Sequence, residues 1–141
     1  MNVPRWLPLP TFLFVLFLAQ GCGLFNGITY YDSTTFKNLT ENKAEVASLY
    51  ETFTGDAVDS NSIRSVRLKL SKMYEYEKGK GAKNQETFRQ IEIIQEAFHR
   101  NVNERLQQGR WSEVHMKNKL EFISDAFDIA IATEALKNKN E

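Results

Sequence analysis

Apolar residues recur at spacings of three and four positions in four stretches of the chain. This is the periodicity of one face of an α-helix, and no stretch alternates apolar and polar residues long enough to require a sheet. Short loops favour antiparallel neighbours, so we expect an all-α fold, a small antiparallel four-helix bundle made of two helical hairpins. An array of stacked hairpins is the alternative. The predicted helices span residues 34–54, 60–78, 84–108 and 112–136.

Each predicted helix has one apolar stripe, and the four stripes should meet in a common core. Lys43 fills the one polar position in the first stripe. The pattern fades after Leu136, where we expect a polar tail that frays. The predicted stripe residues are Phe36, Leu39, Val46, Tyr50 and Phe53; Ile63, Val66, Leu70, Met73 and Tyr74; Phe88, Ile91, Ile94, Phe98, Val102 and Leu106; and Met116, Leu120, Ile123, Phe127, Ala130 and Ile131.

Residues typical of helix ends lie between the stripes. Gly55 and Gly109 should end the first and third helices. Arg105 lies in the last turn of the third helix, where a cation complements the helix dipole. Trp111 and Met116 have the spacing of a hydrophobic staple across the start of the fourth helix. The candidate N-caps are Asp32, Ser33 or Thr34; Asp59 or Ser60; Asn84; and Ser112.

The first 21 residues differ from the rest of the chain. They contain one charged residue, Arg5, and a run of nine mostly apolar residues from 11 to 19. A membrane-spanning helix needs about 20 apolar residues. Pro8 and Pro10 interrupt any longer apolar run. A positive start, a short apolar region and small residues before a cleavage point together predict a secretory signal peptide.

The end of this segment, Leu18-Ala19-Gln20-Gly21-Cys22, resembles the lipobox of bacterial lipoprotein precursors. Ala19 and Gly21 suit that motif, whereas Gln20 is not its commonest residue, and Leu is more usual where Ala19 stands. The resemblance covers only the targeting segment, and the mature domain is not matched to a known family. It implies signal processing that reads Leu18, Ala19 and Gly21, cleavage before Cys22, and attachment of diacylglycerol to Cys22 with frequent acylation of the new amine. The alternative is an ordinary secreted protein with a free thiol.

The lipobox resemblance also implies a cellular location. Several acyl chains hold a protein durably on a membrane without spanning it. In Gram-negative lipoproteins, Asp directly after the lipidated cysteine favours the inner membrane, and here that residue is Gly23. We therefore expect the cell outer membrane, on its periplasmic side, or the outer face of a Gram-positive plasma membrane. The predicted organisation is a signal peptide (1–21), a lipidated N-terminus and linker (22–33) and a helical bundle domain (34–141).

Composition limits the possible functions. A length of 141 residues suits one domain. The 18 Lys and Arg residues balance the 18 Asp and Glu residues, so no overall field attracts nucleic acid, and we expect no nucleic-acid partner. One cysteine can form neither an internal disulfide nor a Cys-rich zinc site.

The residues that could support catalysis or metal binding are few. Glu96 and His99 have the Glu-x-x-His spacing of di-iron bundles, but a second pair is missing and Glu96 points away from the predicted core. The other histidine, His115, is expected to be solvated. Gly79 and Gly81 follow no strand and form no phosphate-binding loop. We therefore expect no metal, no cofactor and no enzymatic activity.

Three aromatic residues are candidates for an interaction surface. Tyr74 and Tyr76 diverge by about 200° on a helix, so at least one of them should be exposed. Phe122 lies off its own stripe. Such residues suit a protein interface, although a wider core would also bury them. The predicted function is a non-catalytic protein-interaction or structural module of the cell envelope, with an envelope protein as its partner.

The alternative function is a carrier of a small apolar ligand inside the bundle. Such a carrier would need an enclosed cavity of about 300 Å³ or more. The residues expected to line this cavity are Phe36, Phe53, Phe88, Phe98 and Phe127.

Overall fold

The computed structural model describes residues 29–137, which contain four long helices and two short 3-10 helices. No strand occurs among these residues. In chain order the elements are α2 (Ser33–Glu51), η2 (Thr52–Thr54), α3 (Ser60–Gly79), η3 (Ala82–Asn84), α4 (Gln85–Gln108) and α5 (Glu113–Leu136).

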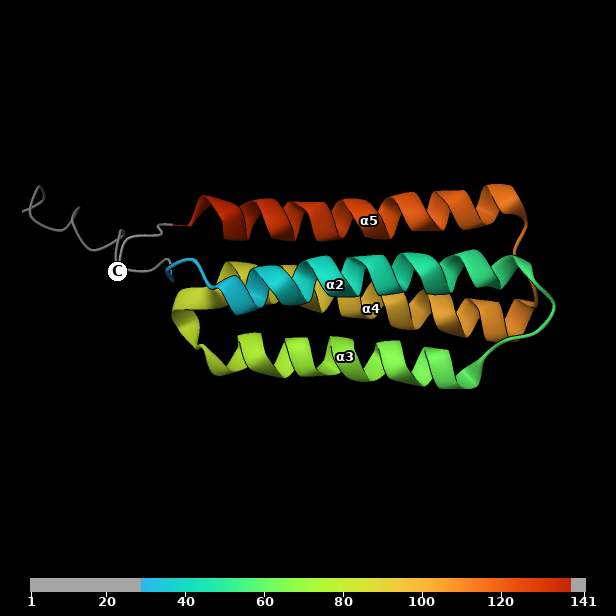
Figure 1. Cartoon of the computed structure of the whole chain (residues 1–141), viewed down its shortest axis with the longest axis horizontal. Helices are drawn as coiled ribbons and strands as arrows, with labels where there is room; N and C mark the ends of the chain where they lie inside the picture. The colour runs from blue at the N-terminus through green and yellow to red at the C-terminus, as the bar shows by residue number, and fades with distance from the viewer. Residues whose placement is uncertain (1–28, 138–141) are drawn as a thin grey trace, which may run out of the picture.

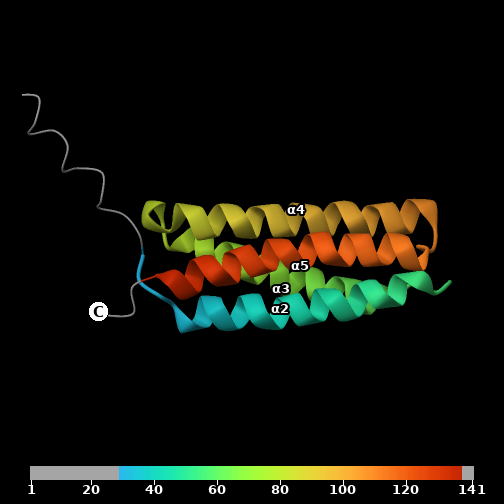
Figure 2. The same cartoon turned by 90° about the horizontal axis from the view of Figure 1, so that it is seen from above.

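The four long helices run up and down beside one another as an antiparallel bundle (Figure 1). Helix α2 contacts α3 and α5, and α4 contacts the same two helices, so the chain closes a ring of four neighbours (Figure 2). This arrangement confirms the predicted bundle of two helical hairpins.

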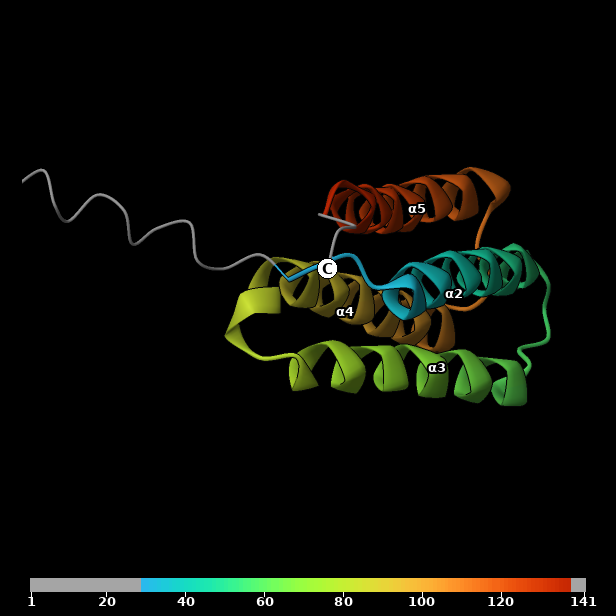
Figure 3. The same ribbon diagram turned by 60° about the vertical axis from the view of Figure 1, so that its left-hand side comes forward.

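The two ends of the bundle differ in what they hold. One end, the proximal end, contains Thr29, the turn at Gly81 and Lys137, because Thr29 and Lys137 both hydrogen-bond Asn84 just after that turn. The start of the described chain therefore lies near the end of α5 (Figure 3). The other end, the distal end, contains the loop around Gly55 and the turn at Gly109. Any segment attached before Thr29 therefore leaves from the proximal end.

The core is formed by the predicted apolar stripes. Their central residues are buried on all four long helices, and Leu49, Ala97 and Trp111 join them. The aromatic rings of Tyr50, Phe53 and Trp111 contact one another toward the distal end, with centroids 5.0–5.5 Å apart. The side chains of Trp111 and Met116 are both buried on either side of the N-cap Ser112, as the predicted staple requires.

The stripe prediction was wrong at the end of α4. Leu106 is 54% exposed, whereas the preceding Arg105 is buried. Arg105 holds the inward position at this level because its side chain hydrogen-bonds three backbone carbonyls of the loop after α2. Its role is thus to close that loop, beyond the expected interaction with the helix dipole.

Three predicted N-caps are confirmed. One carboxylate oxygen of Asp32 accepts the backbone N–H of Thr34 at 2.8 Å, and Asp59 does the same for Asn61 at 2.8 Å. The hydroxyl of Ser112 accepts the N–H of His115 at 3.2 Å.

Two helix-end predictions were wrong. Asn84 makes no capping hydrogen bond with its side chain, which has other partners described below. Gly55 does not end α2, because the helix ends at Glu51 and a 3-10 turn follows. The φ of Gly55 is −78°, so this position does not need the left-handed region that glycine favours.

Core packing predicts a clear contrast between two phenylalanines on α5. Phe127 is fully buried, and Phe127→Ala should lower the free energy of unfolding by about 3–5 kcal/mol. Phe122 is 53% exposed, and Phe122→Ala should change it by less than about 0.5 kcal/mol. Urea denaturation of both variants measures this difference. Equal losses of stability would contradict the described packing.

Candidate functional site

The predicted lipoprotein residues lie outside the described part of the chain. Leu18, Ala19 and Gly21, the predicted processing residues, and Cys22, the predicted lipid attachment residue, all precede Thr29, where the description begins. Among the described helices, none is both long enough and apolar enough to cross a bilayer.

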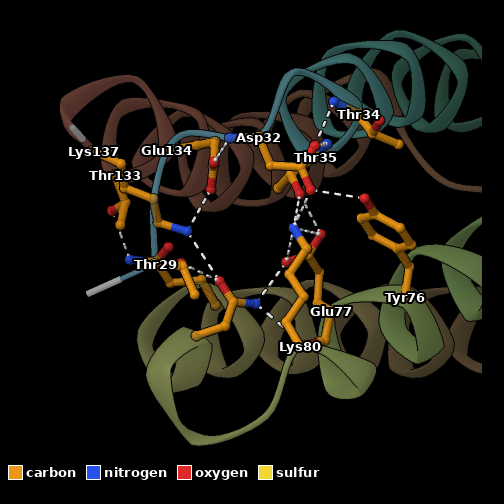
Figure 4. A network of polar contacts seen from close by, with 12 residues as sticks. Thr29, Asp32, Thr34, Thr35, Tyr76, Glu77, Lys80, Thr133, Glu134 and Lys137 are labelled. Atoms are coloured by element: carbon orange, nitrogen blue, oxygen red, sulfur yellow. Dashed lines mark hydrogen bonds and ion pairs between the residues drawn. The ribbon is translucent and has the colours of Figure 1, made fainter. Parts of the chain in front are cut away.

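A network of polar side chains fills the proximal end of the bundle (Figure 4). One half of it lies at the end of α3, where the side chain of Glu77 is fully buried. The hydroxyl of Thr35 donates to one carboxylate oxygen of Glu77, and the amide of Asn84 donates to the other at 2.6 Å. The ammonium group of Lys80 lies 3.1 Å from the Glu77 carboxylate. This buried charge therefore has both a cation and hydrogen-bond donors.

The other half of the network repeats this arrangement at the end of α5. The carboxylate of Glu134 is fully buried, and the ammonium group of Lys137 lies 2.6 Å from it. The backbone N–H of Asp32 donates to the same carboxylate at 2.7 Å. In both halves the lysine follows the glutamate by three residues and lies at the helix C-terminus, where a cation also complements the helix dipole.

Asn84 joins the two halves to the N-terminal segment. Its amide nitrogen donates to Glu77, while its amide oxygen accepts from Lys137 at 3.0 Å and from the hydroxyl of Thr29 at 3.1 Å. The backbone N–H of Thr29 also donates to the carbonyl of Lys83 at 3.2 Å. These contacts attach the chain that precedes α2 to the turn between α3 and α4.

Asp32 connects this network to the surface. Burial opposes ionisation of its carboxyl group, but hydrogen bonds from Lys80 and Tyr76 and from the backbone of Thr34 outweigh burial and hold its pKa well below the usual range. Burial likewise opposes the charge of Lys80, yet the nearby carboxylates of Asp32 and Glu77 raise its pKa. The two groups therefore stabilise each other in the charged state.

The sequence contains a signal for this network that the stripe analysis missed. Glu77 follows Met73 by four positions and continues the stripe of α3, and Glu134 continues the stripe of α5 four positions after Ala130. A glutamate in phase with a core stripe and followed by lysine three positions later indicates a buried ion pair. It follows that Lys137 does not belong to the frayed tail expected after Leu136, because its side chain is buried.

A second network of polar side chains lies nearer the distal end. The amide of Asn101 donates to the hydroxyl of Tyr50 at 3.0 Å, and Lys119 donates to Asn101 at 3.2 Å and to Glu104 at 2.6 Å. His115, expected to be solvated, has a ring nitrogen 2.5 Å from the same Glu104 carboxylate. Burial raises the pKa of Tyr50, which keeps its hydroxyl protonated across the physiological range.

The polar side chains of both networks hold helices together. The Glu104 carboxylate has a lowered pKa, mainly through its hydrogen bond from Lys119, so it does not favour a proton-donor role. Glu96 is exposed and His99 is half-buried. Among residues 29–137, no three His, Cys, Asp or Glu side chains are grouped so that they could hold a metal ion.

The predicted interaction residues lie in three different places. Tyr74 is half-buried and packs on Phe88 with ring centroids 5.0 Å apart. Tyr76 is 41% exposed and donates its hydroxyl to Asp32 at 2.7 Å in the proximal network. Phe122 is exposed on α5. They do not form one surface, and only Phe122 has an exposed ring without a role in the network.

Four hollows among the described residues are open at the surface. One of them has a volume of about 400 Å³ and lies between η3 and the start of α4 on one side and the end of α5 on the other, with Leu136 in its lining. Neither this hollow nor the other three is lined by any of the five phenylalanines proposed for a ligand cavity. Phe53, Phe98 and Phe127 are instead fully buried in the core.

No family model, curated protein or solved structure matches this chain.

Removing one partner of a buried ion pair tests the proximal network. Lys80→Met leaves the buried Glu77 carboxylate without its cation and should lower the free energy of unfolding by about 2–4 kcal/mol. Lys83→Met removes an exposed lysine from the same turn and should cost less than about 0.5 kcal/mol. Urea denaturation at neutral pH compares the two. Losses of the same size would show that Lys80 does not neutralise Glu77.

The lowered pKa of Asp32 predicts a loss of stability in acid. Its folded-state pKa lies below the value of about 3.9 in the unfolded chain, so ionised Asp32 stabilises the fold above that pH, and protonation removes this contribution as pH falls further. Asp32→Asn keeps an N-cap but removes the charge. The variant should be less stable than wild type at pH 7, and the gap should narrow between about pH 5 and pH 2. Denaturation curves across this range measure it, and a constant gap would refute the assignment.

Proposed function

We propose that this protein is a bacterial lipoprotein, a helical bundle held at a membrane by lipid on Cys22 that acts through protein contacts and not through catalysis. The observation that supports this most is the position of the only cysteine. It directly follows Leu18-Ala19-Gln20-Gly21 at the end of a signal-like segment.

The position of Thr29 determines which end of the bundle would lie near the lipid. Thr29 is hydrogen-bonded to Asn84 and Lys83 at the proximal end. Seven residues of chain from Cys22 to Thr29 can span at most about 25 Å. An anchor on Cys22 would therefore keep the proximal end within that distance of the lipid, with the proximal network facing the membrane and the distal end free to extend away from it.

The lipid supplies the energy of attachment. Each buried CH₂ group contributes about 0.8 kcal/mol, so two or three acyl chains bind durably where one binds reversibly. Confinement to a surface raises the effective concentration of the bundle for a partner on the same membrane. We place the protein on the periplasmic side of the outer membrane, because Gly23 and not Asp follows Cys22.

A structural or interaction role agrees with the chemistry of the described residues. The buried charged side chains Glu77, Arg105, Glu134 and Lys137 are each paired or hydrogen-bonded within the fold. Each therefore has a structural use, and the exposed apolar side chains on the outer helix faces are the groups available to a partner.

The anchor is tested by the mass and location of the protein in its native host. We expect cleavage before Cys22, a mass increase of about three acyl chains, and recovery in the membrane fraction after high-salt and carbonate washes. Cys22→Ser should abolish lipid addition and leave the uncleaved precursor. An unmodified thiol in freely soluble protein would overturn the proposal, as would a Cys22→Ser form that is still processed normally and stays membrane-bound.

A further inference from the structure

The hollow of about 400 Å³ between η3, the start of α4 and the end of α5 lies at the proximal end of the bundle, and we name it the proximal hollow. Figure 4 shows Thr133 and Lys137 on its α5 side. Its volume is within the range of about 300–1,000 Å³ that is usual for small-ligand sites. Because the hollow is open on one side, it can hold part of a molecule whose remainder stays outside.

Thr87 brings to the proximal hollow a hydroxyl group that the fold does not use. Thr87 lies in the first turn of α4, lines the hollow and is fully buried. Its hydroxyl oxygen has no hydrogen-bond partner among the described residues. Buried polar side chains are nearly always hydrogen-bonded in folded proteins, so this hydroxyl points to a ligand atom as its partner.

The charged side chains that line the proximal hollow have both signs. Lys83 on η3 and Glu86 in the first turn of α4 are exposed, and neither forms an ion pair with a described residue. The third, Lys137, is already paired with Glu134. The dipole of α4 adds positive potential at its N-terminus. The hollow therefore matches a zwitterion, with Lys83, the helix dipole and the Thr87 hydroxyl suited to a phosphate group and Glu86 suited to an ammonium group.

An exposed apolar side chain completes the lining on the α5 side. Leu136 is 87% exposed, more than any other large apolar residue in the described part of the chain. Contact with the glycerol and upper acyl region of a lipid would remove this apolar surface from water. The proximal end is also the end from which the chain leads to Cys22, and in this respect the inference rests on the proposed function.

We propose that the proximal hollow binds the headgroup of a phospholipid of the ethanolamine type, which carries a phosphate and a primary ammonium group. The hydroxyl of Thr87 donates to a phosphate oxygen, and Lys83 pairs with the phosphate charge. The ammonium group of the lipid donates to the carboxylate of Glu86. Leu136 contacts the glycerol region, while the acyl chains remain in the membrane. This lipid is bound without a covalent bond and is separate from the lipid proposed on Cys22.

The first test uses the full protein purified from its host in an uncharged, phosphate-free detergent. Glycerophosphoethanolamine, the soluble headgroup without acyl chains, is titrated while amide chemical shifts are followed by NMR. The amides of Lys83 and Thr87 should shift in a saturable manner, and the amide of Asp56 at the distal end should not. Glycerophosphoglycerol has the phosphate but no ammonium group and should bind about threefold more weakly. Absence of a saturable shift at Lys83 and Thr87 would overturn the proposal.

Variants of the lining residues assign each group of the headgroup. Thr87→Val should weaken binding of both probes about tenfold without lowering the free energy of unfolding, because the hydroxyl has no partner within the fold. Glu86→Gln should weaken only glycerophosphoethanolamine, so that the two probes bind equally. Lys83→Met should weaken both probes by about threefold. Lys78→Met removes an exposed lysine at the same end that does not line the hollow, and this matched control should bind both probes as the wild type does.

Unchanged affinity in Thr87→Val, or equal losses for both probes in Glu86→Gln, would show that these residues do not contact the phosphate and the ammonium group. Either result would overturn the site.

Native mass spectrometry of the protein extracted in mild detergent identifies the source of the headgroup. One ethanolamine phospholipid should remain bound without a covalent bond in the wild type and be lost in Thr87→Val. A protein that binds the soluble headgroup but retains no phospholipid would overturn the membrane lipid as the ligand and favour a soluble phosphate ester. Covalent lipid mass without headgroup binding overturns the site and leaves the anchor intact, whereas headgroup binding by a protein with an unmodified Cys22 does the reverse.

Discussion

The proximal end of the bundle depends on the neutralisation of two fully buried carboxylates. Glu77 and Glu134 occupy core positions where leucine or isoleucine would otherwise stand, and each is matched by a lysine three residues later. A buried ion pair adds little net stability compared with apolar packing, but loss of one partner is costly. Each pair lies within one helix end, and hydrogen bonds from Thr35 and Asn84 to Glu77 and from the backbone of Asp32 to Glu134 join these ends to the neighbouring segments.

This arrangement explains how a tether at the N-terminus could be held firmly against the folded domain, although the protein has no disulfide. A tether that joins a frayed helix end would leave the domain loosely oriented. Here Thr29 and Asp32, which precede α2, contact three other elements. Thr29 contacts Asn84 directly before α4, and Asp32 contacts Lys80 at the end of α3 and Glu134 at the end of α5. The proposed anchor would thus act on the whole proximal end.

The fold could be predicted from sequence because apolar periodicity reports helix faces directly. The stripe residues Ile91, Phe98 and Phe127 are buried as expected. The polar site could not be predicted in the same way, since its members come from helix ends far apart in the chain and their pairing depends on the packing. Arg105 shows the same limit. Its sequence position suggested a dipole contact, whereas the packed structure turns it toward the carbonyls of Phe53 and Gly55.

If the proximal end faces the membrane, it lies nearer the lipid headgroups than the distal end does, and fluorescence quenching measures this difference. A fluorophore attached at Lys83→Cys reports on the proximal end, and one at Asp56→Cys reports on the distal end, because both positions are exposed and the native cysteine would be blocked by lipid. In vesicles that contain nitroxide-labelled headgroups, we expect much stronger quenching at position 83 than at position 56. Equal quenching, or stronger quenching at position 56, would show that the proximal end does not face the membrane.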